Sequence, residues 1–85
     1  MHDLSESVGV DRPNRAADVK LVQQLLNNHI KALAPMAPLA VTGKVDEATI
    51  AAIRAFQAKV VGLSKPDGAI DRGGKTIKAL STDAP

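Results

Sequence analysis

Apolar side chains recur every three or four positions in two long stretches of the chain. The first stretch covers about residues 15–34, and its repeating apolar positions are Val19, Val22, Leu26, Ile30 and Leu33. The second covers about residues 46–61, and the positions that share its spacing are Thr49, Ile53, Phe56, Gln57 and Val60. Because this spacing lays side chains along one face of an α-helix, each stretch predicts an amphipathic helix with that face buried.

Four residues indicate where these two helices begin and end. Asn14 and Asp46 precede the patterns as N-cap residues, whose side chains accept hydrogen bonds from the first free N–H groups. Pro35 has no N–H to donate and is expected to end the first helix. Gly62 suits the left-handed position that follows a helix C-terminus.

A third, shorter helix is predicted at about residues 73–81, where it would bury Ile77 and Leu80. Residues 1–13 contain glycine and proline without a helical period, which indicates an irregular lead-in. A length of 85 residues supports one domain, residues 1–85. We therefore expect an all-α fold, a compact three-helix bundle behind an irregular N-terminal lead-in.

Two similar glycine turns precede the second and third helices. The segments 43–49 and 68–76 both contain glycine, any residue, a β-branched apolar residue, aspartate and then threonine, with two further residues in the second. Glycine adopts the positive φ that a tight turn demands, the apolar residue would anchor the turn, and aspartate or threonine would satisfy helix-start N–H groups. A pattern used twice favours a structural device over an active site.

Composition narrows the candidate chemistry. The chain has no cysteine and two histidines, His2 and His29, without the spacing or neighbouring carboxylate pair of a metal site. We therefore expect no metal, no cofactor and no catalytic residues. The net charge of +2 comes from scattered residues rather than a basic run. The most apolar run, residues 32–41, contains two prolines and is too short to cross a membrane.

Three blocks of the sequence together resemble the peptidoglycan-binding-domain-like family, small three-helix modules attached to cell-wall hydrolases. The blocks are Asp18 to Asn27 with its Val-Gln pair, Gly43 to Gln57, and Asp67 to Leu80, in the family's order over about residues 8–80. Two positions depart from the family pattern: Thr42 replaces an aspartate, and Asp46 stands where a second glycine is usual. The resemblance implies a three-helix fold and a non-catalytic, wall-binding function.

The resemblance also implies a shallow groove that binds peptidoglycan through hydrogen bonds. Murein offers acetamide groups, hydroxyls and carboxylates, which suit backbone groups, amides and cations. The chain has no Trp or Tyr to stack on sugars. The expected ligand-binding residues are Gln23, Gly43, Arg54, Gln57, Gly68 and Arg72. An alternative role for the two glutamines is hydrogen bonding to loop backbone, and for the two arginines it is simple solvation.

The expected partners are peptidoglycan and a fused or associated cell-wall hydrolase, with the module itself a monomer in the periplasm, cell wall or extracellular space. The N-terminal residues do not resemble a signal peptide, so export would use another route or a longer protein. One alternative is a protein-docking module of the same fold. A helix-turn-helix DNA-binding domain is less favoured, because acidic residues interrupt the basic ones around the second and third helices.

Overall fold

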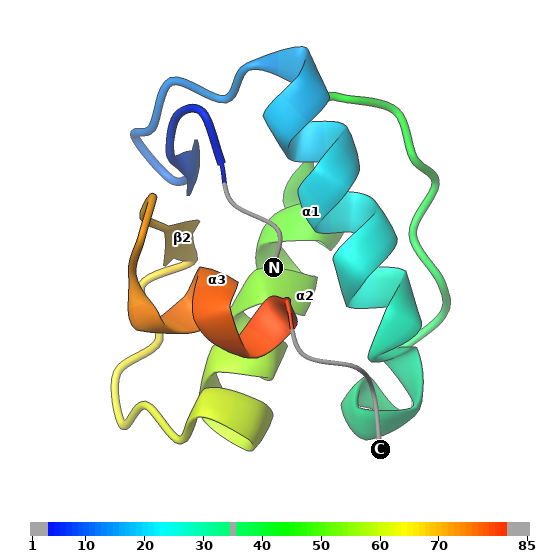
Figure 1. Ribbon diagram of the computed structural model, residues 1–85. Helices are drawn as coiled ribbons and strands as arrows, with labels where there is room; N and C mark the ends of the chain where they lie inside the picture. The colour runs from blue at the N-terminus through cyan, green and yellow to red at the C-terminus, as the bar shows by residue number, and fades with distance from the viewer. Residues whose placement is uncertain (1–3, 35, 82–85) are drawn as a thin grey trace.

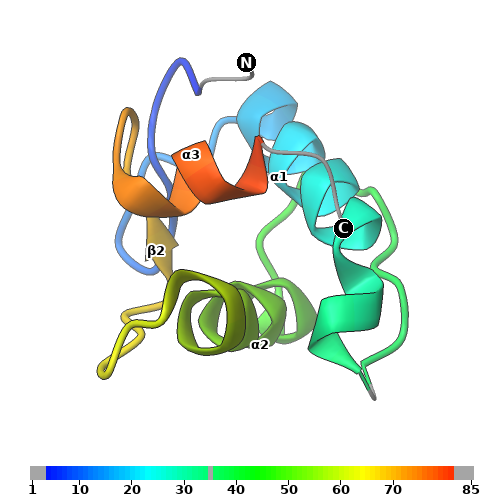
Figure 2. The same cartoon turned by 60° about the horizontal axis from the view of Figure 1, so that its bottom comes forward.

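Three α-helices surround one core in the computed structural model, which describes residues 4–34 and 36–81. They are α1 (Ala16–Asn28), α2 (Glu47–Phe56) and α3 (Lys75–Leu80), and Figures 1 and 2 show them enclosing the core from three sides. The fold is mostly helical, as predicted. Two residues discussed above, His2 and the predicted helix stop Pro35, lie outside the described residues.

A small antiparallel sheet corrects the expectation of an all-α fold. Strand β1 (Val8–Gly9), inside the lead-in that we expected to be irregular, pairs with β2 (Ala69–Ile70). Gly9 permits this approach: its φ is +122°, and a Cβ there would overlap the carbonyl oxygen of Gly68. Strands of two residues show no alternating pattern, and these two come from opposite ends of the chain, so the sequence does not reveal their pairing.

The first helix is shorter at both ends than the predicted range of 15–34. Its N-cap is Arg15, so the prediction that Asn14 caps this helix was wrong. Asn14 has a φ of +56°, and its side-chain amide bonds both the N–H and the C=O of Gly9, at 2.6 and 3.0 Å. After Asn28 the chain tightens into a 3-10 helix, η1 (Ile30–Leu33).

The second helix begins as predicted and ends in a wider turn. The Asp46 carboxylate accepts the N–H of Thr49 at 2.8 Å, which confirms it as the N-cap. The helix continues as a π-helical turn, η2 (Gln57–Val61), and stops at Gly62 with a φ of +84°, also as predicted. The wider π turn changes the spacing of residues around the helix, so Val60, predicted to be buried, is 41% exposed.

The third helix starts later than predicted, and the predicted aspartate or threonine cap is wrong there. Its N-cap is Gly74, which has no side chain. The carboxylate of Asp71 instead pairs with the Arg12 guanidinium, with 2.7 Å between Oδ1 and Nε. Ile77 and Leu80 are buried as predicted.

The core receives side chains from all three helices and both strands. Phe56, the one phenylalanine, is fully buried, and the His29 ring meets its edge at 5.2 Å between ring centres. Residues 36–46 leave η1 and run back along α1 as an extended strap (Figure 1). Asn27 ties this strap to α1 by bonding the N–H and C=O of Leu39 at 2.7 and 2.8 Å.

Candidate ligand-binding surfaces at two glycine turns

The Gly43 turn, residues 42–45, is held by one glutamine of α1. The Gln23 side-chain oxygen accepts the N–H groups of Thr42 and Gly43 at 2.9 and 3.0 Å. The amide nitrogen donates to the Lys44 carbonyl and to the Thr49 hydroxyl, both at 3.1 Å. One side chain therefore fixes the turn and connects it to the first turn of α2.

The Gly68 turn, residues 67–70, is held in the same way by Gln57 at the start of η2. The Gln57 oxygen accepts the N–H of Gly68 at 3.0 Å. Its nitrogen donates to the Ala69 carbonyl at 2.8 Å, and to the Asp67 carboxylate and the Thr76 hydroxyl at 2.9 and 3.3 Å. The sequence repeat is therefore one structural device built twice.

Thr42 and Asp67 occupy equivalent positions in the two turns. The Thr42 hydroxyl accepts the N–H of Lys44 at 3.2 Å, and the Asp67 carboxylate accepts the N–H of Ala69 at 3.0 Å. The bond from Ala69, followed by that from the Gln57 amide, lowers the pKa of Asp67 below its ordinary value. Thr42 thus makes the hydrogen bonds expected of the aspartate that it replaces.

Both glutamine side chains are committed to their turns. Gln23 and Gln57 are 0% and 1% exposed, and no buried side-chain nitrogen or oxygen among the described residues lacks a partner. Their bonding to loop backbone is the alternative role raised from the sequence. Direct ligand contact by these two amides stays a prediction, and it would require a turn to release its glutamine.

A basic side chain lies over the glycine of each turn. Lys20 and Arg54 each stand three residues before the glutamine of their helix. A Cβ built on Gly43 would lie 3.3 Å from Lys20 Cε, and one on Gly68 would lie 3.0 Å from Arg54 Nε. Both basic residues are exposed, and neither side chain has a hydrogen bond or ion pair within the part of the chain that the structure describes. Each turn therefore presents an unpaired cation beside its backbone.

The six predicted site residues fall into two groups. Gln23 and Gly43 meet at one turn, and Arg54, Gln57 and Gly68 meet at the other. Arg72 follows the second turn, where its side chain is exposed and its N–H donates to the Ser7 hydroxyl at 3.1 Å. Lys20 was not predicted, although a cation three residues before each glutamine was a signal available in the sequence.

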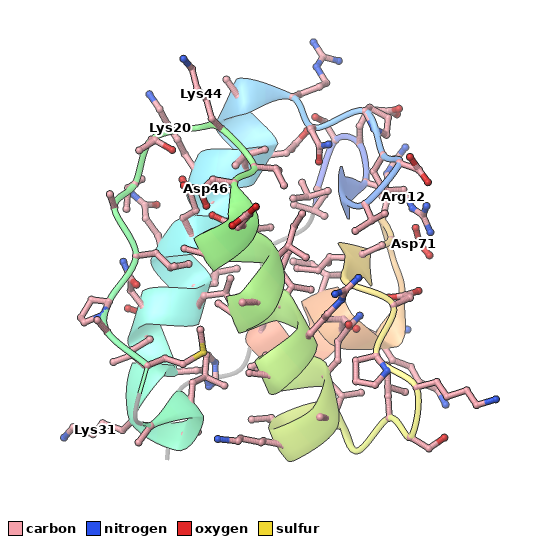
Figure 3. All side chains as sticks on the ribbon, turned by 180° about the vertical axis from the view of Figure 1, so that it is seen from behind. Arg12, Lys20, Lys31, Lys44, Asp46 and Asp71 are labelled. Carbon is pink, nitrogen blue, oxygen red and sulfur yellow. The ribbon has the colours of Figure 1, made fainter. Side chains whose placement is uncertain are left out.

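An exposed ion pair flanks the Gly68 turn on the side of β1. Figure 3 shows Arg12 and Asp71 next to each other there, and the hydrogen bond from Arg12 to Asp71 raises the pKa of the guanidinium. Exposed pairs of this kind add little to stability. The pair also commits Arg12, whereas the Arg54 side chain at this turn stays unpaired among the described residues.

Residues 4–34 and 36–81 contain no group of three His, Asp or Glu side chains placed to hold a metal ion. No helix in the same residues is long and apolar enough to cross a membrane.

Both turns and all three helices lie in a region that matches a known protein family. A family model described as "Putative peptidoglycan binding domain" matches residues 15–80. Strand β1 lies before the matched region, whereas both glutamines, both glycines and both overlying cations lie inside it. No curated protein and no solved structure shows a significant match to the chain.

Proposed function

The chain belongs to the peptidoglycan-binding domain family whose model it matches, and from this premise we propose that it is a non-catalytic module that holds a cell-wall hydrolase or effector on murein. The enzyme would be fused to the module or associated with it. The match over residues 15–80 is the observation that carries the proposal. Binding raises the local concentration of the enzyme on its substrate, and places the module in the cell wall, the periplasm or the extracellular space.

The surfaces at the two turns support weak, polar binding to a repetitive polymer. Each combines backbone that is fixed from behind by a glutamine with a cation that has no partner in the described chain. Cations that form charge-assisted hydrogen bonds suit the carboxylates of murein peptides. Because murein repeats the same groups many times, a modest affinity at each site suffices to retain the module.

The experiment is co-sedimentation of the folded domain with purified, insoluble peptidoglycan. Arg54→Ala is expected to lower the bound fraction because it removes the cation over Gly68. Its melting temperature should stay within about 3 °C of the wild type, since the side chain is exposed. Lys31→Ala is the control: this exposed cation lies in η1, outside both glycine turns, and Figure 3 places it at the opposite end of the molecule from Lys20 and Lys44.

The outcomes separate the site from the function. Unchanged binding by Arg54→Ala would remove Arg54 from the site. Recovery of the wild type in the supernatant alone, over a range of salt and pH, would contradict wall binding itself.

A further inference from the structure

The two turns differ in what lies along their backbone. At the Gly68 turn, the protein's own strand β1 lies alongside: Val8 pairs with Ile70, and the N–H of Val10, just after the strand, donates to the Gly68 carbonyl at 3.2 Å. This turn is therefore already occupied by an extended peptide segment that runs antiparallel to it.

At the Gly43 turn the equivalent backbone groups have no partner. The matching hydrogen bonds of the two turns align Gly43 with Gly68 and Val45 with Ile70. Among the described residues, the Gly43 carbonyl and the N–H and carbonyl of Val45 make no hydrogen bond. Backbone polar groups are almost always paired with protein, water or ligand. Gly43 itself is buried and Val45 is half-buried, so these three groups form an edge that is open in the sense of hydrogen bonding: the chain itself leaves it unpaired.

Two unpaired lysine side chains beside the open edge suit a ligand that carries a carboxylate. Lys20 lies over Gly43, Lys44 is part of the turn, and Figure 3 shows both side chains pointing outward at the same end of the molecule. The nearby Asp46 carboxylate accepts the Thr49 N–H and is held by α2. Glu47 is exposed in the first turn of α2. Neither lysine has an ion-pair partner in the described part of the chain.

We propose that the open edge of the Gly43 turn binds the stem peptide of murein in extended form, antiparallel to residues 43–45, with a peptide carboxylate facing Lys20 and Lys44. The proposal rests on the function proposed above, and it assigns that turn to the peptide of murein instead of the glycan. The occupied turn of the same protein shows that this device accepts an extended segment. A sugar would form fewer hydrogen bonds than an extended peptide with the backbone N–H and carbonyl groups of this edge.

The test is an amide nitrogen–proton NMR titration of the whole chain with two soluble ligands. One is the stem peptide released from murein, and the other is glycan strands stripped of their peptides. Stem peptide should shift the amide signals of Gly43 and Val45 in a saturable way. Replacing Lys20 and Lys44 by glutamine should weaken this binding by at least about threefold, the range expected for two exposed charge contacts. Lys31→Gln should bind as the wild type does.

Each alternative outcome has a distinct meaning. Shifts confined to the Gly68 turn, or binding of glycan strands without binding of stem peptide, would overturn the proposal while wall binding stands. Equal binding of an unrelated extended peptide of the same length and charge would also overturn it, and would instead indicate a protein-docking edge. Failure of the domain to sediment with whole murein would remove the proposed function as well.

Discussion

At the scale of single residues, side-chain amides take the place of backbone partners. Gln23, Gln57, Asn14 and Asn27 each bond backbone groups of a turn, strand or strap that lies outside the helices. From the sequence, the two glutamines have two candidate roles: contact with a ligand, or hydrogen bonding that supports a loop. The sequence could not decide between them, because the choice depends on where a loop at least ten residues away comes to rest.

Gln23→Ala should lower the free energy of unfolding by about 2–4 kcal/mol, because it leaves buried groups of the Gly43 turn without partners. Gln24→Ala, at the exposed neighbouring position, is the matched control and should cost no more than about 0.5 kcal/mol. Urea denaturation followed by circular dichroism measures both. Equal stability of the two variants would contradict the structural role of Gln23.

Asp18 ties the lead-in to α1 and should make stability depend on acid pH. Burial disfavours its charged form, but hydrogen bonds from the Ser5 hydroxyl and N–H and from the Glu6 N–H outweigh this, so its pKa is lowered. Because the folded pKa is below the unfolded one, the carboxylate stabilises the fold above roughly pH 4. This contribution is lost as the pH falls through the folded pKa.

Asp18→Asn should therefore lower the free energy of unfolding by about 1–3 kcal/mol at pH 7, and by less at about pH 2.5. Unfolding curves of both proteins across this pH range provide the measurement. A cost that does not change with pH would show that the charge of Asp18 does not act as described.

At the scale of elements, the sequence predicts the helices but not the contacts that join them or modify their ends. Helical spacing located the first two helices, and Asp46 and Gly62 marked the two ends of the second one. Three features depend on tertiary contacts instead. They are the pairing of β1 with β2, the loss of Asn14 as a cap because its amide bonds Gly9, and the π turn that exposes Val60.

Gly9→Ala should lower the free energy of unfolding by about 2–4 kcal/mol. The added Cβ would overlap the Gly68 backbone, and the alanine would also have to adopt a positive φ, so the sheet would be disrupted. Gly73→Ala is the control for strain alone, since its φ is +71° but a Cβ there would meet nothing within 4 Å. It should cost about 1–2 kcal/mol. Thermal or urea unfolding compares the two, and equal costs would show that the close approach of the strands adds nothing.

At the scale of the whole molecule, two units of the same design share α2. In each unit a glutamine holds a glycine turn, a cation three residues earlier lies over the glycine, and the turn leads into the next helix. The repeat in the sequence predicted that a glycine turn precedes the second helix and another precedes the third. It did not predict Lys20, because the pattern that the two segments share begins at each glycine and Lys20 lies before it. Nor did it predict that one turn is occupied by β1 and the other is open, which depends on the fold.

Phe56 lies where these units meet, so its truncation tests the core as a whole. Phe56→Ala should lower the free energy of unfolding by about 3–5 kcal/mol, because it removes a fully buried aromatic ring. Calorimetry or denaturant unfolding measures the loss. A variant as stable as the wild type would contradict the burial of this ring and its edge contact with His29.

The central claim is that this folded domain binds murein, and the most direct measurement is a binding isotherm of the unmodified chain on purified peptidoglycan sacculi. The account predicts saturable binding of modest affinity that persists at physiological salt, because fixed backbone groups contribute beside the cations. An isotherm that stays at zero over all concentrations of sacculi, with the domain folded throughout, would contradict it.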